Sequence, residues 1–154
     1  MTLSIGDLET HEIEPAVTLW RQVGLTRPWN DPHADIRLAL ASPAATVLAG
    51  RLEGRLAATA MVGADGHRGW VYYLAVSPEA RGRGYGEAMM RAAERWAAAR
   101  GVPKIQLMVR AGNTAVLGFY EAIGYERSDV VVMARWLRGE PVPRGSPAET
   151  EEDA

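Results

Sequence analysis

The 154-residue sequence contains no cysteine, which excludes disulfide bonds, thiol catalysis and thiolate-bound metals. It also lacks any run approaching the ~18 consecutive apolar residues that a membrane-spanning helix needs. The N-terminus has neither the basic start nor the apolar stretch of a secretory signal peptide. We therefore expect a cytoplasmic protein that does not associate with membranes.

A strong charge of one sign is also absent, because 17 basic and 19 acidic residues leave a net charge of -2. Residues 139–154 hold five acids and one base, a net of -4, so residues 1–138 carry +2. This mild charge suits a small anionic ligand better than a nucleic acid, for which a domain pI above ~9 is typical. Residues 139–154 also contain three prolines and no aromatic residue, which predicts a disordered acidic tail. Residues 1–138 are expected to form one domain.

The first half of the sequence changes from helical to strand-like periodicity. Helical spacing from about Thr10 to Val23 ends at Gly24, and Asp31 can cap a second helix that begins at Pro32 and reaches about Leu40. Glu53-Gly54 and Asp65-Gly66 are dipeptides that favour tight hairpin turns. They separate three expected antiparallel strands: Ala45 to Leu52, Arg55 to Val62 and Trp70 to Val76.

The second half predicts a long helix, a strand, a helix and a closing strand. These are expected over Gly86 to Arg100, Lys104 to Arg110, Thr114 to Ile123 with Asn113 as its cap, and Val130 to Leu137. A strand, a long helix and a second strand in succession imply a right-handed parallel crossover. The predicted fold class is mixed α/β, with a mostly antiparallel central sheet, one parallel strand–helix–strand crossover and helices on both faces.

A glycine-rich segment, Arg81-Gly82-Arg83-Gly84-Tyr85-Gly86, lies where a predicted strand leads into the long helix. Glycines there let the main chain approach a ligand, and a helix N-terminus with two arginines favours phosphate. The alternative is a tight connection with solvated arginines. The segment is not a dinucleotide fingerprint, because Glu87 stands where its third glycine belongs, and the sequence has no Gly-Lys-Ser/Thr of a P-loop.

Two motifs carry a family resemblance. The strand "YYLAV", then Pro78-Glu79 and Arg81-x-x-Gly84-x-Gly86 before a helix, resemble the acetyl-coenzyme A (acetyl-CoA) motif of the GNAT family of N-acetyltransferases. The stretch "MVRAGN...GFYEAIGY", from Met108 to Tyr125, is similar to that family's fifth strand, asparagine and tyrosine-bearing helix. RPWNDP together with DGHRG also resembles a YpeA-like bacterial branch.

The resemblance implies a GNAT fold and a set of cofactor-binding residues. The sheet would open between the strand ending at Val76 and the strand beginning at Lys104, and the acetyl-CoA co-substrate would lie in that opening. Main-chain groups of three strand residues would bind its pantetheine arm and acetyl carbonyl, and amides of the glycine segment would bind its pyrophosphate. An asparagine would touch the cofactor, and a tyrosine would stand near its sulfur. These residues are Leu74, Ala75 and Val76; Arg81, Gly82, Arg83, Gly84, Tyr85, Gly86 and Glu87; and Asn113 and Tyr120.

The catalytic roles implied are a carbonyl donor at the Leu74 amide and a general acid at Tyr120, although Tyr120 packing its ring against the sheet is the alternative. Some relatives carry a glutamate as base where this chain has Trp70 or Met108. Substitute bases are Asp31, His67, or a water held by Tyr72 or Tyr73. The acceptor side is expected to include Trp29, Asp31, His67 and Tyr72, whereas RPWNDP is equally well explained as a helix cap with Trp29 filling core.

The resemblance thus implies an acetyl-CoA dependent N-acetyltransferase that acts by direct transfer to an amine. A non-catalytic acyl-CoA-binding regulatory module is the alternative, and dinucleotide binding is a weaker one. No metal is expected, because His11, His33 and His67 share no metal-ligand spacing. Homodimers that pair through their C-terminal strands are an open possibility, and the acceptor amine is not identified by the sequence.

Overall fold

A computed structural model describes residues 2–138, and the acidic tail expected over residues 139–154 lies outside the described residues. These residues form a mixed sheet with the strand order β1-β2-β3-β4-β5. The first four strands pair antiparallel, and β4 pairs parallel with β5. The strands are β1 (Ser4–Asp7), β2 (Ala45–Leu52), β3 (Arg55–Ala64), β4 (Gly69–Val76) and β5 (Ile105–Leu107).

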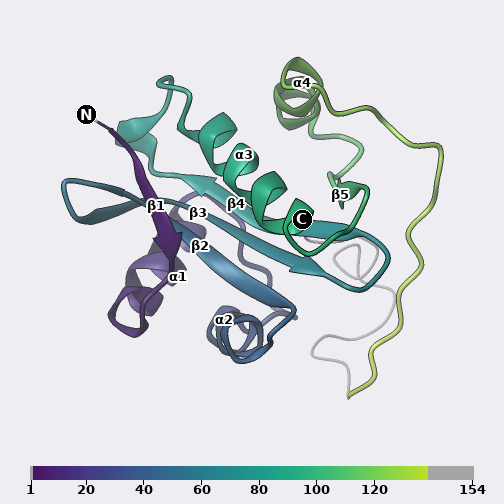
Figure 1. Cartoon of the computed structure of the whole chain (residues 1–154), viewed down its shortest axis with the longest axis horizontal. Coiled ribbons are helices and arrows are strands. Elements are labelled where there is room, and N and C mark those ends of the chain that lie inside the picture. The colour runs from purple at the N-terminus through teal and green to yellow at the C-terminus, as the bar shows by residue number, and fades with distance from the viewer. Residues whose placement is uncertain (1, 139–154) are drawn as a thin grey trace.

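Helices cover both faces of this sheet (Figure 1). A 3-10 turn, η1 (Thr10–Glu12), leads into α1 (Ile13–Gln22), which packs with α2 (Pro32–Ala41) on one face around the fully buried Trp20 and Ile36. A second turn, η2 (Pro78–Ala80), precedes α3 (Tyr85–Ala98), which covers the other face together with α4 (Thr114–Ala122). Among residues 2–138 no helix is long and apolar enough to cross a membrane.

The mixed α/β class, the antiparallel β2-β3-β4 meander and the parallel β4-α3-β5 crossover are confirmed. The conformation of the β2–β3 turn accounts for its Glu-Gly dipeptide. Glu53 and Gly54 have φ of 50° and 78°, and a tight two-residue hairpin turn requires this left-handed conformation at both positions. Asp31 caps α2 as expected, since its side chain accepts hydrogen bonds from the amides of His33 and Ala34.

One strand was missed by the sequence reading, and one predicted strand is wrong. The N-terminal strand β1 was not expected, because its four residues, Ser-Ile-Gly-Asp, are too short and polar to show alternation. The closing strand predicted from Val130 to Leu137 is absent from the described residues, where this segment is irregular and runs away from β5 (Figure 1). Its residues have strand-forming side chains, but within the described residues this segment pairs with neither edge of the sheet. Its large apolar side chains are consequently exposed.

Candidate active-site cavity

The sheet opens between its two parallel strands. The β4–β5 ladder joins Gly69 to Ile105 and ends with Val71 opposite Leu107, whereas β4 continues to Val76. Beyond Val71, therefore, the edge of β4 that faces β5 has no strand partner among the described residues. Main-chain N–H and C=O groups on such an edge need other partners when they are buried, so this gap is suited to a ligand that forms hydrogen bonds.

A cavity of about 270 Å³ lies at this gap. Its walls come from both faces of the sheet: Val23 and Leu25, after α1, belong to the core on the α1/α2 face, whereas Val116 and Tyr120 of α4 belong to the core on the α3/α4 face. The cavity therefore passes through the plane of the sheet where β4 and β5 separate. Of the residues expected to bind acetyl-CoA, it is lined by Leu74, Ala75, Val76, Arg81, Asn113 and Tyr120.

The glycine segment begins at the cavity wall, because its first residue, Arg81, lines the cavity. Gly82 and Gly84 have φ of 78° and 80°, and Gly84 is the N-cap of α3. A β-carbon added at either position would have no atom within 4 Å. Both positions therefore favour glycine because of their left-handed backbone conformation, which residues with a side chain rarely adopt. Steric crowding is not the reason, since open space surrounds both.

Gly86 has a different explanation from the one that the sequence suggested. Its β-carbon would lie 3.2 Å from the ring of Phe119, so this glycine makes room for α4 to pack on α3. The expectation that all three glycines clear space for a pyrophosphate is corrected at this position. Arg83 and Glu87 are exposed, Tyr85 is half-buried, and none of the three lines the cavity. The Glu87 carboxylate instead forms an ion pair with the Arg91 guanidinium, one helical turn later, at an N···O distance of 3.2 Å.

The strand β4 contains an irregularity beside the cavity. Met61 of β3 is opposite Tyr72 and Thr59 is opposite Ala75, so Tyr73 and Leu74 together face the single residue Ala60. This is a β-bulge, which bends a strand and interrupts its ladder. The bulge turns Leu74 toward the α3/α4 face and Tyr73 toward the α1/α2 face.

Tyr120 lies in the cavity wall with 9% of its surface exposed. Its ring packs edge-on against Phe119 and Tyr125, with centroids 5.0 and 5.7 Å apart. Burial raises the pKa of Tyr120 to about 12, because the surroundings solvate a phenolate poorly. The hydroxyl therefore stays protonated at neutral pH. Asn113 caps α4 by accepting a 3.3 Å hydrogen bond from the Val116 amide, as its position in the sequence predicted.

Of the four residues expected on the acceptor side, one lies in the cavity wall and three lie elsewhere. Tyr72 lines the cavity, whereas Trp29, Asp31 and His67 do not. Trp29 is buried, Asp31 caps α2, and His67 is an exposed residue of the β3–β4 connection. Sequence reasoning missed Arg27 and Arg110 in the cavity wall. Two features of the sequence could have indicated them: Arg110 lies within the motif "MVRAGN", and residues 1–138 carry a net charge of +2.

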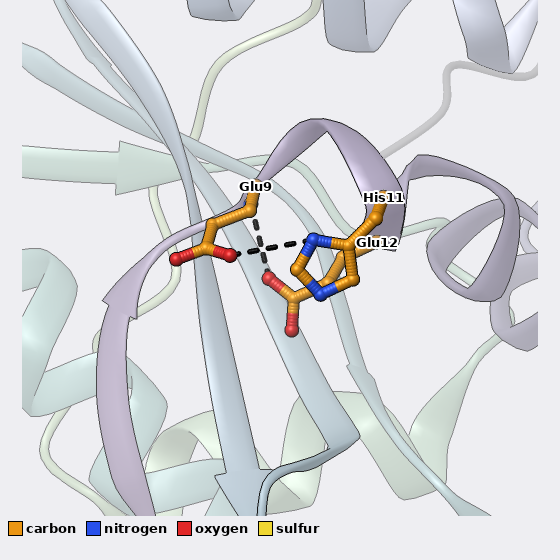
Figure 2. Close-up of side chains that lie close together, drawn as sticks. All are labelled: Glu9, His11 and Glu12. Carbon is orange, nitrogen blue, oxygen red and sulfur yellow. Dashed lines mark hydrogen bonds and ion pairs between the residues drawn. The ribbon is translucent and has the colours of Figure 1, made fainter.

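A group of three potential metal ligands lies elsewhere, at the turn before α1 (Figure 2). Each has another partner: Glu12 receives hydrogen bonds of 2.6 and 2.8 Å from Arg51 and one of 3.0 Å from the Glu9 amide, and Glu9 lies 3.3 Å from the His11 ring. The Arg51 guanidinium lowers the pKa of Glu12. The group ties η1 to β2, and it contributes no residue to the cavity wall.

Comparison with known proteins adds a sequence and a structural match. Residues 14–125 match the model of the acetyltransferase (GNAT) family. The fold is similar to that of AAC(6')-Iy in complex with the bisubstrate analogue CoA-S-monomethyl-acetylneamine, with a TM-score of 0.76 and 19% identity over 88% of this chain and 99% of that one.

Two further solved structures share this architecture. A transcriptional regulator from Bacillus halodurans C-125 gives a TM-score of 0.75 and 17% identity over 88% of this chain and 100% of that one. A ribosomal-protein-alanine N-acetyltransferase from Brucella melitensis biovar Abortus 2308 gives a TM-score of 0.70 and 20% identity over 88% of this chain and 100% of that one. At such identities the likeness establishes the fold.

Proposed function

Because the chain belongs to the acetyltransferase (GNAT) family, we propose that it transfers the acetyl group of acetyl-CoA to a primary amine. The observation that carries the proposal is the cavity between the diverging strands β4 and β5, whose wall includes Arg81, three residues before Gly84, the N-cap of α3. An arm of pantetheine would fit the gap, where the β4–β5 ladder of the described residues has ended at Val71 and β4 continues to Val76. Its diphosphate would bind the amides of residues 81 to 87, since a helix N-terminus attracts anions.

The charge of the cavity also suits this co-substrate. Arg27, Arg81 and Arg110 line it, whereas no aspartate, glutamate or histidine does among the residues that the structure describes. Coenzyme A carries a diphosphate and a further phosphate, which guanidinium groups bind as bidentate partners. The fit supports acyl-CoA over a cationic ligand for this part of the cavity.

In the proposed reaction, bound acetyl-CoA supplies the thioester whose carbon–sulfur bond breaks as the amine nitrogen takes the acetyl group. The Leu74 main chain donates a hydrogen bond to the carbonyl oxygen, a contact worth ~3 kcal/mol when it is well placed. Tyr120 donates a hydrogen bond to the departing sulfur. A pKa of about 12 makes complete proton release unfavourable, because a thiol titrates near ~8.5. Tyr120 therefore stabilises the thiolate, which finally takes the proton that the amine loses.

The acceptor is inferred from the missing base. The cavity wall offers no carboxylate or imidazole within the described residues, so the amine must lose its proton readily. Nearby arginines favour the neutral form of a bound amine. An α-amine, with a pKa of ~7.8, loses its proton more easily than a lysine amine at ~10.4. We propose an α-amine or another amine of low pKa as the acceptor, and water held by Tyr72 as the route for its proton.

The experiment that tests this function is thiol release from acetyl-CoA across a panel of amino acids, short peptides, polyamines and aminoglycosides. The chain has no cysteine, so a thiol reagent reports the product alone. Acceptor-dependent release that is lost with heat-inactivated protein supports the proposal. Saturable binding of acetyl-CoA without turnover on any acceptor would instead favour the non-catalytic acyl-CoA-binding module. Assignment to the YpeA-like branch and a cytoplasmic location stay predictions.

A further inference from the structure

The main chain of Tyr73 adopts an unusual conformation at the centre of the sheet. Its φ is 52°, in the left-handed region that a bulky residue rarely enters. Tyr73 is the first residue of the bulge, directly before Leu74. A conformation of this kind persists only where surrounding contacts hold it in place.

One set of contacts holds the carbonyl of Tyr73. The Thr59 hydroxyl of β3 donates a 2.8 Å hydrogen bond to the Tyr73 carbonyl oxygen. That hydroxyl in turn accepts a 2.8 Å hydrogen bond from the Trp20 indole N–H of α1. Thr59 and Trp20 are both 0% exposed, so water cannot replace either contact.

A second set holds the Tyr73 side chain. Its ring stacks on Trp20 with centroids 3.7 Å apart and an interplanar angle of 6°. Its hydroxyl donates a 2.7 Å hydrogen bond to the Asp35 carboxylate of α2. Elements α1, α2 and β3 thus each supply one residue that fixes Tyr73, and none of these residues lines the cavity.

We propose that Trp20, Thr59 and Asp35 are positioning residues that act through Tyr73 to aim the main chain of Leu74 at the acyl group. The inference rests on the proposed function, because it assumes that a thioester carbonyl lies beside Leu74. Tyr73 stands behind the cavity wall, whereas its neighbours Tyr72 and Leu74 form part of that wall. A small rotation at Tyr73 would therefore redirect the Leu74 amide without changing the side chains that a ligand touches.

The test is the isosteric substitution Thr59→Val, with Thr59→Ser as the conservative variant and Thr46→Val as a matched control. Thr46 is also a buried strand threonine, and its hydroxyl donates one 2.9 Å hydrogen bond, to Asp7. We expect Thr59→Val to lower kcat roughly 10- to 100-fold, as displacement of a catalytic group does. The Kd for coenzyme A should change less than about threefold, because the residues that bind its phosphates are untouched.

Thr59→Ser should restore most of the native kcat, and Thr46→Val should lower thermal stability while leaving kcat within about twofold of native. An equal loss of kcat in Thr59→Val and Thr46→Val, or no loss in Thr59→Val, would overturn the inference. So would a loss that Thr59→Ser does not reverse, since the hydroxyl would then not be the cause.

A binding experiment separates this inference from the proposed function. The Leu74 amide resonance should shift more on addition of acetyl-CoA than of coenzyme A, because only acetyl-CoA brings the carbonyl. Thr59→Val should remove that difference, and Thr46→Val should keep it. This result would support the positioning role even if no acceptor were acetylated. Equal shifts with both ligands in the native chain would contradict it, whatever the turnover.

Discussion

The substitution Gly84→Ala tests how the glycine segment presents its amides. Gly84 has a φ of 80°, and an added β-carbon meets no atom within 4 Å. The whole effect of alanine is therefore conformational. Left-handed alanine costs ~1–2 kcal/mol, and the stiffer unfolded chain offsets ~0.4–1 kcal/mol of this. The expected net loss is about 1 kcal/mol in the free energy of unfolding.

The expected loss of coenzyme A affinity is larger than this strain alone. Gly84 is the N-cap of α3, so a loop that relaxes to avoid the strain also turns the first amides of the helix. A hydrogen bond to a charged group contributes ~1.5–3 kcal/mol, and losing one would weaken binding about tenfold or more. Titration calorimetry with coenzyme A measures the affinity, and urea denaturation measures the stability.

Gly54→Ala provides the matched control. Gly54 has a φ of 78° and equally open surroundings, but it lies in the β2–β3 turn. Alanine should cost a similar stability there and leave coenzyme A affinity unchanged. If both variants bound coenzyme A as tightly as the native chain, the amides at the start of α3 would not hold the diphosphate, and the reasoning would be refuted.

Further perturbations test other parts of the account. Tyr120→Phe should lower kcat roughly 10²-fold, as loss of one hydrogen-bond donor to developing charge does, with little change in the KM for acetyl-CoA. Because the pKa of Tyr120 is raised to about 12, the native rate should show no loss from its ionisation between pH 7 and 10. Glu12→Gln should cost about 2 kcal/mol of stability at pH 7, measured by urea denaturation. Arg51 lowers the pKa of Glu12 below its usual value of 4.5, so this ion-pair stability is fully present above that pH and is lost as the pH falls through the folded-state pKa. A Glu12→Gln penalty that did not shrink at all as the pH was lowered would contradict it.

The sequence predicted those elements whose local signals agree with their packing. The strands β2 to β4 were found from alternation and turn dipeptides, and α3 from its apolar face. The bulge at Tyr73 was beyond sequence reasoning, because tyrosine disfavours the left-handed conformation and is held in it by contacts from Trp20, Thr59 and Asp35, which lie far away in the sequence.

The sequence also predicted only some of the residues that line the cavity. Leu74, Asn113 and Tyr120 were named from motifs and do line the cavity. Arg27 reaches the same cavity from the irregular connection between α1 and α2, and no periodicity indicates where such a connection runs. The segment from Val130 to Leu137 was predicted as a strand from its residue types, which report strand propensity and not whether the segment packs beside the edge of the sheet at β5.

The central claim is that a coenzyme A molecule occupies the gap between β4 and β5 with its diphosphate on the first amides of α3. A crystal structure obtained with saturating acetyl-CoA tests it most directly. The account predicts density for the pantetheine arm along Leu74 to Val76 and for the diphosphate at residues 81 to 87. An empty gap, or a ligand held elsewhere on the chain, would contradict it.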